Sequence, residues 1–215
     1  MKEFGLGGRG TYKSPAPDFS TPDTAANALR SPNHETRYLA WKALESFGAK
    51  SIEALGKMFE DPNPRMAARA LWVIGKIELP KPDKLKFIHA GLKHSDPDVR
   101  VMSIRLCVQL RNELKMVDIQ QQILTQDALP EVKRAILIGI RQWQIEHLPS
   151  VWAEIANQYV SGDRWFLEAL GIAAEEGHWN ECINAWIDLN AAEVGETKRS
   201  RIHRAVVKGS NNTEV

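Results

Sequence analysis

Cysteine is scarce in this chain, which excludes a disulfide framework. The 215 residues hold two cysteines, Cys107 and Cys182, and the motif Cys-x-x-Cys-His that attaches c-type haem does not occur. No apolar run approaches the ~20 residues that a helix needs to span a bilayer. Residues 1–10 carry charge but no apolar stretch, so we expect any export signal to lie outside this sequence.

A net charge of one sign is also nearly absent. The chain carries 28 Lys and Arg against 27 Asp and Glu, a formal charge of +1. This balance provides no global field that would steer the protein toward nucleic acid or an anionic membrane, and it leaves only local basic patches. Hydrophobic residues make up 43% and charged residues 26%, which is typical of a folded globular chain.

What is present is a loop-to-helix junction that recurs along the sequence. Its prolines stand at 32, 62, 97 and 130, in steps of 30, 35 and 33 residues, and a weaker copy covers residues 161–167. Self-similarity at such a period is the signature of a repeat array. At each junction a Ser or Asp is expected to cap the helix, with proline in its first turn. The basic residue that follows is Arg37, Arg65, Arg100, Lys133 or Arg164.

Apolar residues three and four apart follow each junction, and another amphipathic segment precedes it. Val99, Met102, Ser103, Leu106 and Leu110 form one such stripe. No sustained apolar–polar alternation occurs, so we predict no sheet. The predicted first helices cover residues 21–30, 49–60, 82–94, 116–126 and 147–160, their partners cover 33–47, 63–78, 97–111, 130–143 and 162–176, and a capping pair covers 178–189 and 196–208.

The junction Asp-Pro-x-x-x-Arg between paired helices resembles the HEAT repeat, and the resemblance covers roughly residues 20–176. It implies an all-α fold, a right-handed α-α superhelix of the HEAT or armadillo-like solenoid type, with about five to six helix pairs. We expect a flexible leader over residues 1–19, the solenoid over 20–208 and a disordered tail over 209–215.

Three stretches carry a closer resemblance: residues 18–33 (DFSTPDTAANALRSPN), 36–44 (TRYLAWKAL) and 162–174 (GDRWFLEALGIAA). They resemble the helical segment of large planctomycete-type bacterial proteins that join a β-propeller of membrane-bound dehydrogenase type, a HEAT region and a c-type cytochrome domain. The resemblance implies a periplasmic or extracytoplasmic protein in which the helices link a sugar- or alcohol-directed propeller to a haem module. It carries over an architectural role and no functional residue.

Several candidate sites have simpler interpretations. Residues 5–10 match G-x-G-x-x-G but have no preceding strand, so we interpret them as part of the leader. His178 and Cys182 are four apart on a predicted helix but lack further metal ligands in the sequence nearby. Cys107 lies on an apolar stripe without a base beside it. We therefore predict no catalytic residue, no metal site and no cofactor, and the chain is not expected to be an enzyme.

The second helix of each pair lines the concave surface of a HEAT array. Most of the seven tryptophans are expected to fill seams between repeats, with Trp41 and Trp165 as candidates for exposure. A solvated face that binds nothing is the competing interpretation. Aligning the junction arginines places on or near this surface Tyr38, Lys42, Met66, Arg69, Arg105, Arg134, Arg141 and Trp165.

These features predict a non-catalytic interaction or scaffold module that contacts a protein or the neighbouring domains of a parent chain. The alternative is a nucleic-acid-binding HEAT protein similar to the alkylpurine DNA glycosylases, which would need a groove dense in Lys and Arg. The locally basic residues 198–204 could contact phosphate or form an amphipathic capping helix. We expect a protein partner rather than nucleic acid.

Overall fold

The computed structural model describes residues 16–111, 129–141, 148–160, 162–174, 178–190 and 202, and within these residues every regular element is a helix. The first helices of the pairs are α1 (Pro22–Ala28), α3 (Ile52–Phe59, after the 3-10 turn η1, Gly48–Ser51), α5 (Lys81–Leu92) and α9 (Leu148–Asn157). The second helices are α2 (His34–Phe47), α4 (Pro64–Lys76), α6 (Pro97–Gln109), α8 (Pro130–Ile140) and α10 (Arg164–Ala173), and α11 (Trp179–Leu189) follows.

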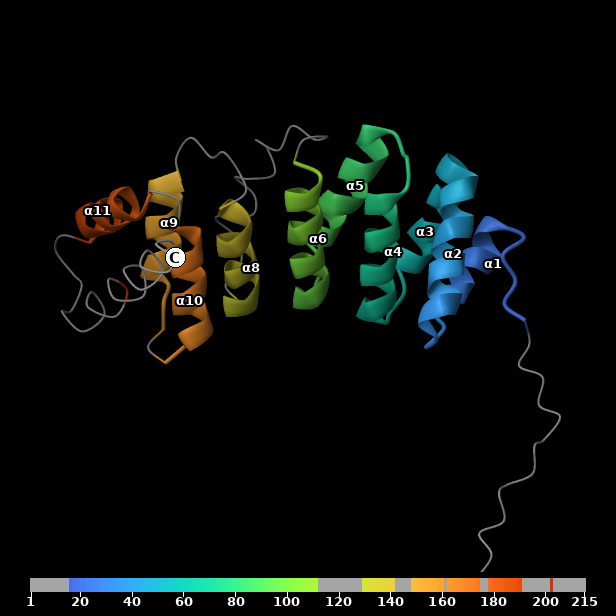
Figure 1. Cartoon of the computed structure of the whole chain (residues 1–215), viewed down its shortest axis with the longest axis horizontal. Helices are drawn as coiled ribbons and strands as arrows, with labels where there is room; N and C mark the ends of the chain where they lie inside the picture. The colour runs from blue at the N-terminus through green and yellow to red at the C-terminus, as the bar shows by residue number, and fades with distance from the viewer. Residues whose placement is uncertain are drawn as a thin grey trace, which may run out of the picture.

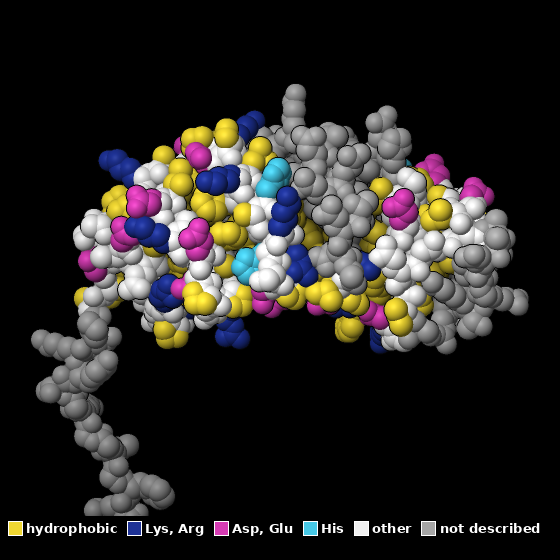
Figure 2. Space-filling view, turned by 180° about the vertical axis from the view of Figure 1, so that it is seen from behind, with side chains coloured by type: hydrophobic (Ala, Val, Ile, Leu, Met, Phe, Trp, Pro, Cys, Tyr) yellow, Lys and Arg dark blue, Asp and Glu magenta, His cyan; other side chains and the backbone are white. Residues whose placement is uncertain are grey.

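The second helices stand side by side in one row (Figure 1). Seen from behind, the row bends into an arch whose lower edge is hollowed (Figure 2). This arrangement confirms the predicted all-α solenoid. None of the described helices is long and apolar enough to cross a membrane. The predicted helix over 116–126, the leader up to residue 15 and the tail over 209–215 lie outside the described residues. Of the predicted helix over 196–208 only Ile202 is described, and it is helical and buried.

The core is divided into successive clusters along the row, as expected when each repeat buries its apolar side against its neighbours. One cluster joins α1 to α4, and a second extends from α5 to α11. Between them Ala67 and Leu71 of α4 contact Val99 and Leu106 of α6. The predicted stripe on α6 is confirmed, since its Val99, Ser103 and Leu106 are all fully buried.

Two helices begin one residue after their predicted starts at 33 and 63, and their capping residues lie two residues after the expected Ser31 and Asp61. The side chains of Asn33 and Asn63 cap α2 and α4 by accepting a hydrogen bond from the backbone N–H two residues on, at 2.8 and 3.1 Å. The predicted caps, Ser31 and Asp61, instead accept from the N–H groups of Asn33 and Asn63 at 3.1 and 2.8 Å. They form the turn before the helix, because short polar side chains also hydrogen-bond the backbone in turns.

Of the later helices, α6 and α8 begin where predicted, at residues 97 and 130, whereas α10 begins at residue 164, two residues after its predicted start. Asp96 caps α6 and accepts from the N–H of Asp98 at 2.9 Å, and Asp163 caps α10 and accepts from that of Phe166 at 2.9 Å. Leu129 precedes α8 without a side-chain cap. Counted between the residues that precede the second helices (Asn33, Asn63, Asp96, Leu129 and Asp163), the repeats are 30, 33, 33 and 34 residues long. Prolines 32 and 62 are therefore not equivalent to prolines 97 and 130.

Arg37 and Arg100 have the same structural role. Each stands four residues after its cap, and its Nη1 donates to the carbonyl oxygens of the two residues before the cap, at 2.7–2.9 Å. These two arginines therefore tie each second helix to the turn that leads into it.

Replacing Arg100 with alanine is expected to lower the free energy of unfolding by about 1–2 kcal/mol, because two carbonyl oxygens lose a charged donor. Urea denaturation followed by circular dichroism measures the change. Arg105→Ala is the matched control, since the exposed Arg105 on the same helix forms no hydrogen bond or ion pair with a described residue. Equal losses in the two variants would contradict a structural role for Arg100.

Candidate functional site

Positions on the second helices can be compared by counting from the residue that precedes each helix, and equivalent positions are then exposed on each. At 3.6 residues per turn, the positions two, five, six, nine and twelve residues later fall within an arc of about 120°. We call this surface the second-helix face. All seven candidate residues occupy one of these positions, namely Tyr38, Lys42, Arg69, Arg105, Arg134, Arg141 and Trp165. Met66, also placed near this surface by the arginine alignment, is buried at 6% exposure because it lies three residues after Asn63.

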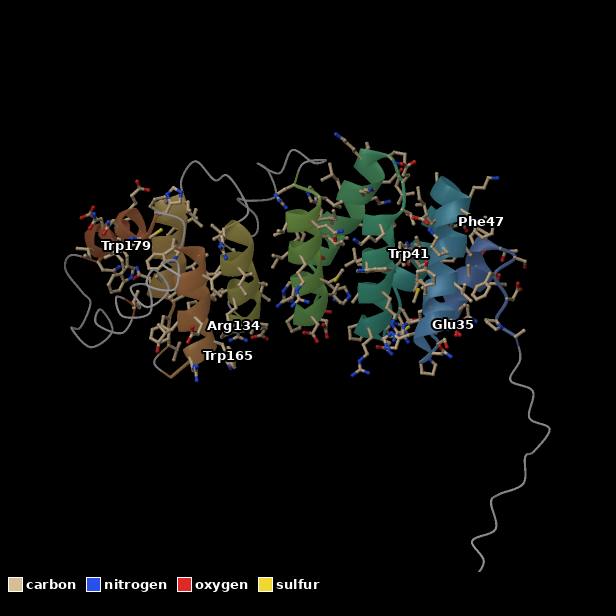
Figure 3. All side chains as sticks on the ribbon, viewed as in Figure 1. Glu35, Trp41, Phe47, Arg134, Trp165 and Trp179 are labelled. Atoms are coloured by element: carbon tan, nitrogen blue, oxygen red, sulfur yellow. The ribbon has the colours of Figure 1, made fainter. Side chains whose placement is uncertain are left out.

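An open groove of about 880 Å³ runs across this face over α6, α8 and α10. It brings together three of the seven candidates, Arg105, Arg134 and Trp165. Arg134 and Trp165 lie toward the lower ends of neighbouring helices α8 and α10 (Figure 3). The lining also includes apolar residues, among them Val101, Val108, Ala135, Ile138 and Ile172, and the charged residues Asp98, Glu131, Arg164 and Glu168.

The remaining four candidates lie elsewhere. Tyr38 and Lys42 belong to α2, Arg69 belongs to α4, and Arg141 directly follows α8 outside the groove lining. Arg69 is half-buried, while the other three are exposed. The structure therefore divides the predicted surface into a groove over α6, α8 and α10 and a second region over α2 and α4.

The charges in the groove nearly balance. Arg134 Nη1 lies 2.9 Å from Asp163 Oδ2, and Arg164 Nε lies 3.6 Å from Glu168 Oε1. The guanidinium of Arg164 also lies 6.0 Å from the ring centre of Trp165. Three arginines thus share the groove lining with three carboxylates, and the groove lacks the dense positive charge that a nucleic-acid site needs.

Large apolar side chains are exposed in the groove and also on α4. Trp165 is 70% and Ile138 49% exposed, and on α4 Trp72 is 37% exposed. Trp165 was expected to be exposed, whereas Ile138 and Trp72 were not identified from the sequence. Both stand nine residues after the residue that precedes their helix, which is one of the positions of the second-helix face, so the correct capping residue would have identified them.

A row of aromatic rings crosses from α2 to α4. Ring centres of Tyr38 and Trp41 are 5.6 Å apart, and those of Trp41 and Trp72 are 5.2 Å apart, both in edge-to-face geometry. Trp41, the other tryptophan expected to be exposed, is half-buried between them, and its indole N–H is buried without a partner. Lys42 Nζ lies 5.3 Å from the Trp41 ring centre and Lys76 Nζ 6.0 Å from that of Trp72.

The candidate metal pair does not converge. His178 is exposed and its Nδ1 lies 3.1 Å from Glu181 Oε2, while Cys182 is fully buried. In the part of the chain that the structure describes, no three His, Cys, Asp or Glu residues are grouped so that they could hold a metal ion.

Both thiols are expected to be nearly inert in the folded protein. Burial raises the pKa of Cys107 and of Cys182 to about 12. At pH 8 only about one thiol in 10,000 is then the reactive thiolate. A chromogenic disulfide reagent should label both cysteines quickly in denaturant and very slowly in the native chain. Rapid labelling of the native chain would contradict their burial.

The described fold and face define a class of protein, the α-solenoids built from stacked helix pairs with an extended surface along their second helices. The family model for HEAT repeats matches residues 22–100 and 52–141, which together span more than half of the chain. The chain belongs to the HEAT-repeat family. A comparison with curated proteins found no match.

Proposed function

We propose that this HEAT-repeat chain is a non-catalytic interaction module that binds a partner protein along its second-helix face. The observation that carries the proposal is the open groove with Trp165 exposed on its lining. An exposed tryptophan gains free energy when a partner covers it, and tryptophan and arginine are the residues that most often dominate binding at interfaces. A repeat array offers such a long surface rather than a deep, enclosed pocket.

The groove has the composition of a protein interface. Its apolar lining, which includes Val101 and Ile138, is combined with charged groups that already have partners, such as Arg134 with Asp163. Interfaces typically combine an apolar centre with a polar rim. Arg105 forms no hydrogen bond or ion pair with a described residue, so its guanidinium is available to a carboxylate or carbonyl of the partner.

The finer proposal is that the module links the propeller and cytochrome domains of a larger extracytoplasmic protein. Its support is the resemblance of residues 18–33, 36–44 and 162–174 to the helical segment of such proteins. The reading frame on either side of this chain in its genome tests it. Propeller blades upstream and Cys-x-x-Cys-His downstream are the expected result, and a frame without either would contradict the link.

Photo-crosslinking in the native host tests the interaction itself. A benzophenone amino acid replaces Ile138 in the groove in one variant and Lys86 in another, an exposed residue of α5 on a first helix. We expect a discrete crosslinked protein from position 138 and none from position 86. Adding Trp165→Ala should weaken the crosslink at 138 by about tenfold, as for a central interface residue. The same products from both positions would contradict the proposal, and crosslinks to nucleic acid would favour the alternative function.

A further inference from the structure

Two guanidinium groups, those of Arg37 and Arg69, meet at the turn between α1 and α2, and the charge of a third, Arg65, acts on Arg69. Arg37 Nη1 donates to the carbonyl oxygens of Ser31 and Pro32 at 2.8 and 2.7 Å. From α4, Arg69 Nη1 donates to the carbonyl oxygen of Leu29 in the same turn, at 2.6 Å. Arg65 stands one helical turn before Arg69, and its exposed guanidinium forms no hydrogen bond or ion pair with a described residue.

No carboxylate among the described residues forms an ion pair with this arginine cluster (Arg37, Arg65 and Arg69). Burial, and then the charges of Arg37 and Arg65, lower the pKa of Arg69. The Asp61 carboxylate is bonded to Arg30 and to the Asn63 N–H. Since like charges held together are unfavourable, an anionic group placed here would be stabilised.

Glu35 is the other carboxylate at this end of α2. Its side chain is exposed and forms no ion pair with a described residue. Figure 3 shows Glu35 at the lower end of α2, with Trp41 higher up the same helix. An acidic group from outside would therefore find the cluster's guanidiniums without a competing ion pair in the part described.

The cluster is continuous with exposed aromatic surface. Arg65 occupies on α4 the position that Trp165 occupies on α10, two residues after the cap. Tyr38, next to Arg37, is 55% exposed and Trp72, one turn beyond Arg69, is 37% exposed. Together α2 and α4 carry five cations (Arg37, Lys42, Arg65, Arg69 and Lys76) and two carboxylates (Glu35 and Glu45), of which Glu45 pairs with Lys42.

We propose that the arginine cluster, with Tyr38 and Trp72, is a docking site for an acidic peptide segment of the partner. The carboxylates of the segment would bind the guanidiniums, which match carboxylate geometry, and its apolar residues would cover the aromatic rings. This inference rests on the proposed function, because it assigns a partner chemistry to one end of the same face.

A peptide fits this surface better than nucleic acid does. A nucleic-acid strand that followed the face from α4 toward α8 would meet Asp98 and Glu131, which occupy on α6 and α8 the position of Arg65. Its regularly spaced phosphates would be repelled there. An acidic segment can end before α6 or change its charge along its length.

Fluorescence anisotropy of a labelled peptide, Glu-Glu-Trp-Glu-Glu-Trp-Glu, tests the proposal on the full chain. We expect binding that weakens with added salt, and no binding of the peptide with glutamine in place of glutamate. Arg65→Glu should weaken binding by about tenfold or more. Lys86→Glu makes the same charge change on α5, at an exposed residue without an ion pair to a described residue, and should change binding less than about twofold.

Four outcomes would overturn the proposal: no binding up to about 1 mM peptide, equal binding of the glutamine peptide, equal losses in Arg65→Glu and Lys86→Glu, or tighter, Arg65-dependent binding of an oligothymidine. Circular dichroism of Arg65→Glu establishes that the variant is folded. The crosslink from position 138 keeps the two claims separate. If that crosslink forms while the acidic peptide does not bind, this inference fails and the interaction function stands.

Discussion

Replacing Trp152 with alanine is expected to lower the free energy of unfolding by about 3–5 kcal/mol. The indole of Trp152 is fully buried on α9 within the cluster that joins α5 to α11, and its Nε1 donates to the carbonyl oxygen of Leu170 at 2.9 Å. Alanine would leave a large cavity and would remove one of the two donors to this carbonyl oxygen, which also accepts from the backbone N–H of Ala174. Urea denaturation followed by far-ultraviolet circular dichroism measures the loss.

Trp165→Ala is the matched control, because it removes the same side chain from a site that is 70% exposed. We expect it to change the free energy of unfolding by less than about 0.5 kcal/mol. The contrast separates a tryptophan that holds the fold from one that is available to a partner. Comparable losses in the two variants would show that Trp165 is structural, and the proposed binding role would lose its main support.

Gly91→Ala is expected to lower the free energy of unfolding by about 1–3 kcal/mol, as overpacking does. A Cβ at Gly91 of α5 would lie 2.1 Å from Ser103 Oγ on α6 and 2.8 Å from Leu71 Cδ1 on α4. Three helices approach closely at this point, so the neighbours have little room to move. The same denaturation experiment measures this change.

The steric cause can be isolated by a second substitution. Ser103→Ala removes the atom nearest to the new Cβ, so it should recover part of the loss in the Gly91→Ala background. Gly56→Ala on α3 is the control, since its Cβ would meet only Phe87, at an ordinary 3.5 Å. There alanine should stabilise by about 0.5–1 kcal/mol through its higher helix propensity. Equal destabilisation at both glycines would argue against the tight contact.

The helices could be predicted from sequence because their signals are local. Apolar spacing and capping residues lie within each segment, and the predicted helix over 97–111 differs from α6 only in its last two residues. The capping residues of α2 and α4 were predicted wrongly because two polar residues precede each helix and either can cap it. Asn33 caps where Ser31 was expected, and the Ser31 side chain instead accepts from the N–H of Asn33.

The candidate site was predictable only in outline. The exposed arc on each second helix is broad, so an error of one or two residues in alignment still left seven of the eight residues on the second-helix face. Only Met66 was misplaced, since it is buried. The groove over α6, α8 and α10 was not predictable, because it depends on the space left between side chains of three helices. The hydrogen-bond partners of the arginines could not be predicted either. Arg134 donates to the Asp163 carboxylate and Arg69 to the Leu29 carbonyl oxygen, whereas Arg65 has no partner among the described residues.

The central claim, that a partner covers the second-helix face, is tested most directly by hydroxyl-radical footprinting of the complex with the protein crosslinked at position 138. The exposed side chains of Trp165, Trp72 and Tyr38 report on the face, and Leu189, 54% exposed on α11, serves as the reference. The account predicts that oxidation of Trp165 falls several-fold in the complex while that of Leu189 is unchanged. Undiminished oxidation of Trp165 in the saturated complex would contradict it.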